Sequence, residues 1–230
     1  QPRYARNELT MGLYFDLTIS GANDYKLSSD KTGAHRKILA YAQPGLSILD
    51  VGCGAGYIGA AFKEKGCYAV GIEADEKRAS QAAKILDKVI VSDIEDIPSL
   101  PFPKHSFDII ICADVLEHLK RPDKMLVSLK SYVKEKGIVL ISVPNIAGID
   151  MRLRLLRGIF RYENGGTMDK THLRFFTKST IHELLRMCGY EITKSQTSGI
   201  FSNYSFLKIF DPLFAFQFII AARPLTDATT

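Results

Sequence analysis

The length, composition and charge of the chain fit one globular domain. Of its 230 residues, 46% are hydrophobic and 24% are charged, which is enough apolar material for a sizeable core. A net charge of +5 does not indicate nucleic-acid binding without a clustered basic face, so we expect no nucleic-acid partner. The cysteines are far apart and form no CxxC pair, which favours free thiols in a cytoplasmic protein over a disulfide framework or a zinc site. They are Cys53, Cys67, Cys112 and Cys188.

No stretch of the sequence predicts a membrane span or a secretory signal. Residues 1–10 are polar and lack the apolar core of a signal peptide. The longest apolar stretch, 206–222, is interrupted by Lys208, Asp211, Pro212 and Gln217, which breaks it too often for a membrane helix.

Helical and strand-like segments alternate along the first 145 residues. Residues 28–42 have the apolar spacing of a helix and are followed by Pro44-Gly45. Short runs rich in Ile and Val are typical of buried strands and lie at 47–51, 68–72, 88–91, 107–112 and 137–143. Segments of helical character separate them, at 56–65, 75–86 and 121–133. This alternation predicts an α/β fold with a parallel sheet and helices on both faces, whose ligands bind at the carboxyl ends of the strands.

The alternation stops after residue 145. An amphipathic segment at 149–161 leads into a polar glycine turn, followed by an expected helix at 179–188 and strands at 190–197 and 216–222. We therefore divide the chain into an N-terminal helical cap, a ligand-binding core, a lid or substrate insertion, and a C-terminal helix with a strand hairpin. These parts are 1–45, 46–145, 146–178 and 179–224.

The stretch "LDVGCGAGYIG", residues 49–59, places four glycines behind the first expected strand. Residues 54–59 fit GxGxxG, the dinucleotide fingerprint. Residues 50–56 fit a second frame, in which Asp50 anchors the loop or an ammonium group and the glycines let the backbone approach a nucleoside. Because the strand ends at Gly52, two residues before GxGxxG begins, we favour the second frame. Its expected ligand contacts are Asp50, Gly52, Cys53, Gly54 and Gly56.

Acidic residues follow the next strands of the core. Glu73, with Ala74 after it, is placed to hold ribose hydroxyls. Asp93 follows the third strand, where its carboxylate can accept from an adenine amino group or cap a helix. The fourth strand ends at Ala113 and Asp114, which we expect beside the remainder of the same ligand.

At this point the sequence resembles the class I S-adenosylmethionine-dependent methyltransferases. "ILDVGCGAG" is similar to their first motif, Glu73 to their second-strand acid, Asp93-Ile94 to their adenine contact, and "FDIIICADVLEHL" to their fourth-strand motif. The resemblance spans 28–145, with a weaker match to the C-terminus. It implies a Rossmann-like, doubly wound, mostly parallel seven-stranded sheet with an antiparallel C-terminal strand. It also implies S-adenosyl-L-methionine as cofactor and one methyltransferase domain over 1–230.

Candidate catalytic residues follow the fourth strand. Methyl transfer mainly requires positioning of the acceptor and, for a hydroxyl, removal of its proton. Asp114, Glu117 and His118 have the spacing that would share one face of a helical turn, and such a group could bind a divalent ion. The stretch resembles the ubiquinone-biosynthesis O-methyltransferases, whose comparable group is implicated in metal binding. In other class I methyltransferases "LEH" occurs without a metal, and we favour His118 as a proton acceptor or acceptor-site contact.

A second cluster of candidates lies in "DKTHLRFFTKSTIHELL", residues 169–185. It resembles a segment of bacterial methyltransferases that act on small molecules and glycans. His172 and Arg174 could close over the acceptor or bind an anionic group. Alternatively, Thr177 or Ser179 caps the following helix while the neighbouring phenylalanines pack at its base.

Segment 149–161 predicts a basic amphipathic helix. Such a helix can lie on an anionic membrane at the inner membrane surface, or grip a phosphorylated substrate. The alternative, which we favour, is a lid packed on the sheet with a solvated arginine face. The expected apolar arc is Met151, Leu153, Leu155, Leu156, Ile159 and Phe160, opposite Arg154, Arg157 and Arg161.

The sequence therefore predicts a methyltransferase that acts on oxygen of a small molecule or a glycan or lipid-linked intermediate. An NAD(P)-dependent oxidoreductase is disfavoured by the strand register at Gly52 and by Asp93. A nucleic-acid methyltransferase would be expected to show an N/D-P-P-Y/F motif where this chain has "CADVLEH". The remaining alternative is a protein that binds S-adenosylmethionine without turnover.

Overall fold

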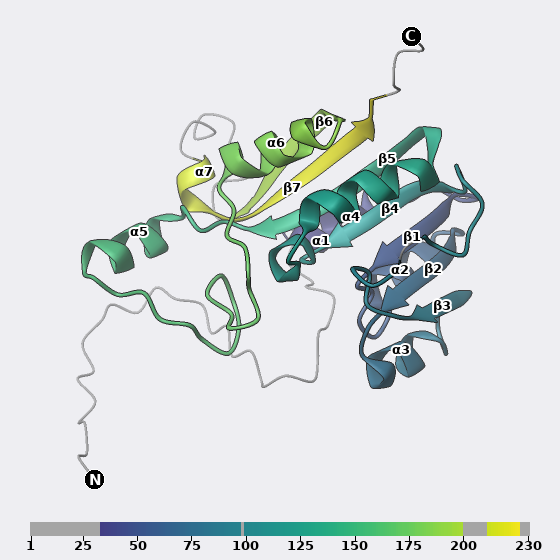
Figure 1. The fold of residues 1–230 in the computed structure, drawn as a ribbon, viewed down its shortest axis with the longest axis horizontal. Coiled ribbons are helices and arrows are strands. Elements are labelled where there is room, and N and C mark those ends of the chain that lie inside the picture. Colours follow the sequence, from purple (N-terminus) through teal and green to yellow (C-terminus); the bar gives the residue numbers. More distant parts are fainter. Residues whose placement is uncertain (1–32, 98, 200–210, 226–230) are drawn as a thin grey trace.

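A seven-stranded sheet forms the centre of the computed structural model, which describes residues 33–97, 99–199 and 211–225. The strand order is β3-β2-β1-β4-β5-β7-β6, and the first five strands along the chain pair in parallel. The last strand pairs antiparallel with both of its neighbours. This is the predicted Rossmann-like sheet with its antiparallel C-terminal strand (Figure 1). The strands are β1 Ser47–Val51, β2 Tyr68–Glu73, β3 Lys88–Val91, β4 Phe107–Ala113, β5 Val133–Pro144, β6 Tyr190–Gly199 and β7 Ala215–Pro224.

Helices cover both faces of the sheet, as predicted. One buried cluster joins the sheet to α4 and α6, and a second joins it to α1, α2 and α3. The helices are α1 Ala34–Leu39, α2 Tyr57–Glu64, α3 Glu76–Ala82, α4 Pro122–Leu129, α5 Ile149–Leu156, α6 Lys178–Met187 and α7 Asp211–Phe214, with 3-10 turns η1 Leu116–His118 and η2 Lys130–Tyr132. No helix among the described residues has both the length and the apolarity needed to cross a bilayer.

Several predicted elements differ in length from the observed ones. The helix expected at 121–133 ends at Leu129, because β5 starts at Val133, which pairs with Phe107 across a register shift. The helix expected at 75–86 ends at Ala82, after which the chain turns to bury Leu86. The first five residues of the helix expected at 28–42 lie outside the described residues.

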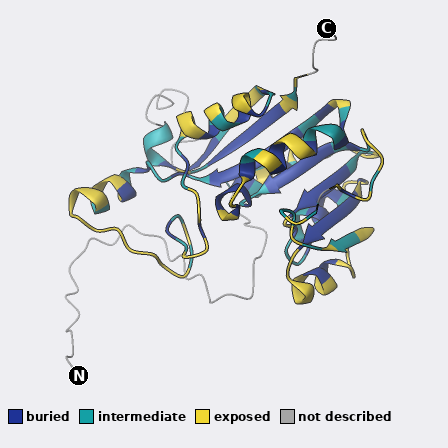
Figure 2. Ribbon diagram, in the orientation of Figure 1, coloured by how far each residue is buried: buried dark blue, intermediate teal, exposed yellow. Residues whose placement is uncertain are grey.

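The expected packed lid at 149–161 is wrong in two respects. Helix α5 ends at Leu156, because Gly158 adopts a left-handed φ of +69° and the Ile159 amide donates back to the Arg154 carbonyl. Only Met151 of the expected apolar arc is buried. The helix extends beyond the end of the sheet, and most of it is exposed (Figures 1 and 2).

The sheet order places a binding crevice between β1 and β4. The chain leaves β1 toward β2 on one side and returns to β4 on the other, and ligands of such sheets bind where the order reverses, beyond the carboxyl ends of the strands. The loops after β1, β2, β3 and β4 meet at this edge. They carry the residues that the sequence singles out.

Candidate active site

The glycine loop after β1 has a backbone that only glycine adopts readily. Gly52, Gly54 and Gly56 have φ values of +67°, +55° and +87°, all in the left-handed region. Gly59 instead lies within α2, where a Cβ atom would come 2.6 Å from a methyl group of Leu86. The left-handed positions are therefore those of the frame that starts at Asp50, and Gly59 serves close packing.

Asp50 lies beneath this loop, at the end of β1. Its side chain is buried, and burial raises its pKa to about 7, against the opposing effect of a hydrogen bond from the Gly59 backbone. Its Oδ2 atom has no hydrogen-bond partner among the described residues. The contact with Gly59 joins β1 to α2 and favours the loop-anchoring role over direct pairing with an ammonium group.

Glu73 connects the end of β2 to the glycine loop. Its Oε2 atom accepts a hydrogen bond of 2.8 Å from the Gly54 amide, and Oε1 accepts one of 2.9 Å from the Asp75 amide. Arg78 lies 3.5 Å from Oε1. Each carboxylate oxygen has a second lone pair, so Glu73 can hold the loop and still accept from ribose hydroxyls. Its role as a ribose ligand stays a prediction.

The other predicted cofactor contacts lie around the same edge. Asp93 is exposed after β3, and its Oδ1 atom accepts from the Glu95 amide at 2.9 Å, the turn-capping alternative. The predicted contact of Asp93 and Ile94 with an adenine base stays a prediction. Ala74 is exposed, whereas the thiol of Cys53 is buried against Gly71. Cys53 can therefore reach a cofactor only through its backbone.

The carboxylate of Asp114 forms a network that the sequence did not reveal. It accepts from the Ser142 hydroxyl at 3.0 Å and from the Gln217 amide at 2.8 and 3.0 Å. Asp114 has a left-handed φ of +54°, next to Ala113 at the end of β4. The signal for Gln217 was its place as a polar residue within an apolar strand.

His35 on α1 is a second residue that sequence reasoning missed. Its Nδ1 atom is buried without a hydrogen-bond partner in the described structure. Burial lowers the pKa of His35, while the nearby Asp114 carboxylate opposes this effect. Burial likewise raises the pKa of Asp114. Helix α1 thus brings an imidazole toward the end of β4.

Asp114, Glu117 and His118 do not share one helical face, contrary to the prediction. The chain forms the short 3-10 turn η1 instead of an α-helical turn, so the side chain of Glu117 is buried and that of His118 is largely exposed. The carboxylate of Asp114 instead accepts hydrogen bonds from Ser142 and Gln217. The side chain that completes the cluster is His172.

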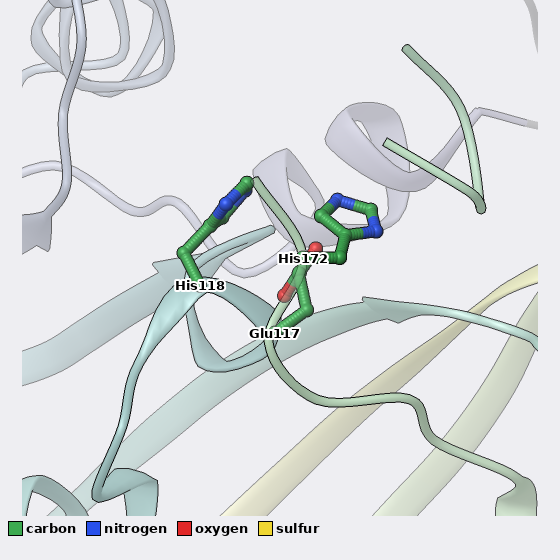
Figure 3. A group of neighbouring side chains, drawn as sticks. All are labelled: Glu117, His118 and His172. Atoms are coloured by element: carbon green, nitrogen blue, oxygen red, sulfur yellow. The ribbon is translucent and has the colours of Figure 1, made fainter. Parts of the chain in front are cut away.

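His118 and His172 meet although 53 residues separate them in the sequence (Figure 3). Their ring centroids are 4.8 Å apart at an interplanar angle of 73°. Their separate loops are joined by the Glu117 carbonyl, which accepts from the amides of Leu173 and Arg174 at 2.7 and 2.9 Å. The Arg174 guanidinium donates to the Lys120 carbonyl, so in this structure it fastens the loop. Its predicted contact with an acceptor stays a prediction.

The backbone fixes the proton positions on both imidazoles. Nδ1 of His118 lies 3.2 Å from the Thr171 carbonyl oxygen, and Nδ1 of His172 lies 3.0 Å from that of Thr167. A carbonyl oxygen only accepts, so Nδ1 carries the hydrogen and Nε2 of a neutral ring keeps a lone pair. Partial burial and the charge of His172 lower the pKa of His118, which keeps it neutral near pH 7.

The carboxyl group of Glu117 is buried beside these two rings. Neither of its oxygens has a hydrogen-bond partner among the described residues. Burial, followed by repulsion from Asp114, raises its pKa to about 9. Glu117 is therefore protonated at neutral pH in the absence of a cation.

This burial predicts a pH-dependent stability. The pKa of Glu117 is near 9 in the folded state and 4.5 for a solvent-exposed glutamate. Because the folded state holds this proton more tightly, the free energy of unfolding is highest below pH 4.5 and falls as the pH rises toward 9. We expect wild type to lose roughly 1 kcal/mol of unfolding free energy per pH unit between about pH 5 and 8, relative to Glu117→Gln. Urea unfolding of both proteins with a chelator present measures this. A difference that is independent of pH would contradict the assignment.

The fold and the glycine loop together define the class I S-adenosylmethionine-dependent methyltransferases. A family model described as "Methyltransferase domain" matches residues 26–195. The chain therefore belongs to this methyltransferase family.

Curated relatives and solved structures agree with this class. A ubiquinone biosynthesis O-methyltransferase of Rickettsia canadensis is 29% identical over 157 residues, which cover 64% of this chain and 63% of that protein. A probable S-adenosylmethionine-dependent methyltransferase of Mycolicibacterium smegmatis is 24% identical over 163 residues, 71% of this chain and 58% of the relative. The chain thus spans about three fifths of the length of these relatives.

The solved structures share the fold at low sequence identity. A SAM-dependent methyltransferase from Archaeoglobus fulgidus superimposes with a TM-score of 0.62 and 21% identity, covering 83% of this chain and 91% of that one. The magnesium protoporphyrin IX methyltransferase of Synechocystis, solved with bound SAH, gives 0.62 and 17%, with coverage of 84% and 83%.

Proposed function

We propose that the chain transfers a methyl group from S-adenosylmethionine to a hydroxyl oxygen of a small molecule or of a glycan or lipid-linked intermediate. The observation that carries this proposal is the pair His118 and His172, whose Nδ1 atoms face backbone carbonyls so that each Nε2 keeps a lone pair. His118 lies on the loop that follows β4, and His172 lies on the loop that precedes α6. The loop that follows β4 packs on the glycine loop. Val115 lies against Gly52, where an added Cβ atom would come 2.9 Å from a methyl group of Val115. The name of the Rickettsia relative also supports oxygen as the acceptor atom.

The proposed reaction requires one proton acceptor. The acceptor oxygen attacks the methyl carbon in line, the carbon–sulfur bond breaks, and its electron pair stays on sulfur to give S-adenosylhomocysteine. The hydroxyl proton moves to Nε2 of His118 or His172. Because the sulfonium is already a good leaving group, the remaining task of the chain is to position both substrates.

The alternative functions are tested by different ligands and products. An oxidoreductase would bind NADH, but the left-handed glycines belong to the frame that starts at Asp50. A protein without turnover would bind S-adenosylmethionine and methylate nothing.

The loops expected to select the acceptor include residues 1–30 and 198–212, most of which lie outside the described residues.

Mass spectrometry on a cell extract incubated with the protein and methyl-labelled S-adenosylmethionine tests the proposal. We expect a labelled methyl ether in the small-molecule or lipid fraction. Label confined to nitrogen or carbon would overturn oxygen transfer. No labelled product from any pool would favour the binding protein without turnover.

The cluster of Glu117, His118 and His172 also has the donor set of a divalent metal site. One ligand atom from each residue lies within 4.8 Å of the others, and two imidazoles with one carboxylate suit a transition metal. Ligating histidines ordinarily donate their other N–H to a carbonyl, as both rings do here. The unpartnered Glu117 oxygens fit this role. A metal bound there would occupy the Nε2 lone pairs. It would then replace the histidines as the activating group, by lowering the pKa of the acceptor hydroxyl.

Zinc addition should therefore stabilise wild type through Glu117 and His172. At a hundredfold excess over its dissociation constant, we expect Zn²⁺ to raise the thermal midpoint by roughly 5 °C, because the ion binds only the folded site. Glu117→Gln and His172→Ala should lose this increase, whereas His182→Ala, on α6 and outside the cluster, should keep it. Equal increases in all four proteins would show that the ion binds elsewhere.

A further inference from the structure

Residues 149–162, which we call the amphipathic segment, expose large apolar side chains on a part of the molecule away from the sheet. Leu156 is 83% exposed, and Leu155 and Phe160 are each about half exposed at 48% and 51%. The segment lies beyond the end of the sheet and is largely exposed (Figure 2). The other exposed apolar residues of the segment are Leu153, Ile159 and Tyr162.

The charge of this surface is mainly positive. The amphipathic segment contains four arginines and one acidic residue, Asp150, in the first turn of α5. Arg154 pairs with Glu163 at 2.6 Å, and Arg152 donates to the Ala147 carbonyl. The guanidinium groups of Arg157 and Arg161 form no hydrogen bond or ion pair with any described residue. Their charges are therefore available to a partner.

Aromatic contacts join the amphipathic segment to the histidine pair. The ring of Phe160 lies 5.9 Å from Tyr162 and 6.2 Å from Phe175, centroid to centroid. Phe175 in turn lies 6.4 Å from His172. A surface bound by this segment would thus lie next to the candidate active site.

We propose that the amphipathic segment docks on an anionic lipid bilayer. Its leucines and Phe160 enter the headgroup region, and Arg157 and Arg161 pair with lipid phosphates. Charge complementarity selects this partner, since an apolar protein surface would leave two unpaired arginines at the contact. The proposal goes beyond the proposed function and does not depend on methyl transfer.

Flotation with phosphatidylcholine vesicles, with and without phosphatidylglycerol, tests the proposal. We expect wild type to float with the anionic vesicles and at least tenfold less with neutral ones. Arg157→Ala with Arg161→Ala should weaken binding about 25-fold, because each arginine near an anionic surface contributes about fivefold. Leu155→Ser with Leu156→Ser should abolish binding at any lipid composition.

Matched controls distinguish docking through this segment from a nonspecific effect of the protein's net charge or of its exposed apolar surface. Lys65→Ala with Lys124→Ala removes two exposed charges elsewhere, and Val127→Ser with Met187→Ser removes two apolar side chains that are 54% and 78% exposed. Both controls should float like wild type. Circular dichroism confirms that every variant is folded.

Two results would overturn the proposal. Wild type that remains unbound to anionic vesicles, or paired variants that bind as well as wild type, would exclude a bilayer as the partner. If light scattering then shows a dimer that the leucine variant dissociates, a second copy of the chain covers the segment instead.

Discussion

Glu73→Ala should lower the affinity for S-adenosylmethionine at least about 100-fold. Each hydrogen bond to a charged group contributes about 1.5–3 kcal/mol, and we expect this carboxylate to accept from the ribose hydroxyls. The substitution also removes the acceptor of the Gly54 and Asp75 amides. The glycine loop loses its fastening to β2 in addition to the ligand contact. Calorimetric titration with S-adenosylhomocysteine measures the change.

Variants at two other acidic residues, Glu64 and Asp50, show whether the loss of affinity is specific to Glu73. Glu64→Ala removes an exposed carboxylate from α2 and should bind like wild type. Asp50→Asn keeps the shape of the buried anchor and should lose less affinity than Asp50→Ala, which we expect to abolish binding. If Glu73→Ala binds S-adenosylhomocysteine with unchanged affinity, the ribose assignment is wrong.

Loss of either histidine should separate turnover from cofactor binding. We expect His118→Ala and His172→Ala to lower kcat by roughly 100-fold or more, the usual contribution of a general base. Their affinity for S-adenosylhomocysteine should stay within about threefold of wild type, because neither ring touches the glycine loop or Glu73. Steady-state kinetics with the acceptor found by mass spectrometry, alongside calorimetry, measures both quantities.

The pH profile gives this experiment a second readout. Because the pKa of His118 is lowered, kcat/KM should be level near neutral pH and should start to fall at a pH below the ordinary imidazole pKa of about 6.5. The His182→Ala control removes an imidazole that bonds Ser195 outside the cluster and should leave the profile unchanged. Full activity in both His118→Ala and His172→Ala would refute the catalytic assignment while leaving the fold intact.

The sequence predicted most of the fold and the part of the site expected to bind the methyl donor, S-adenosylmethionine. Strands rich in Ile and Val, glycines at alternate positions and acids at strand ends are local signals, and each follows from a backbone or burial requirement. The alternate left-handed glycines after Asp50 are an example. Glu73 was found by its position alone, although its bonds to the loop amides were not foreseen.

The acceptor side depends on contacts between distant parts of the chain. Because residues 116–118 form a 3-10 turn, Glu117 does not share a helical face with Asp114 as predicted. The third member of the cluster, His172, comes from a loop more than 50 residues later in the sequence. His35 and Gln217 converge on Asp114 from α1 and β7. No spacing rule within one segment reveals such meetings. The exposure of α5 was missed because an amphipathic pattern does not show which surface covers its apolar face.

We expect the glycine loop and the histidine pair to form one active site. A crystal structure with S-adenosylhomocysteine tests it most directly. We expect the ribose hydroxyls on Glu73, and the sulfur facing the loop that carries His118, with room for one acceptor between sulfur and the Nε2 atoms of His118 and His172. A sulfur atom that faces away from both histidines, with protein between them, would contradict the account.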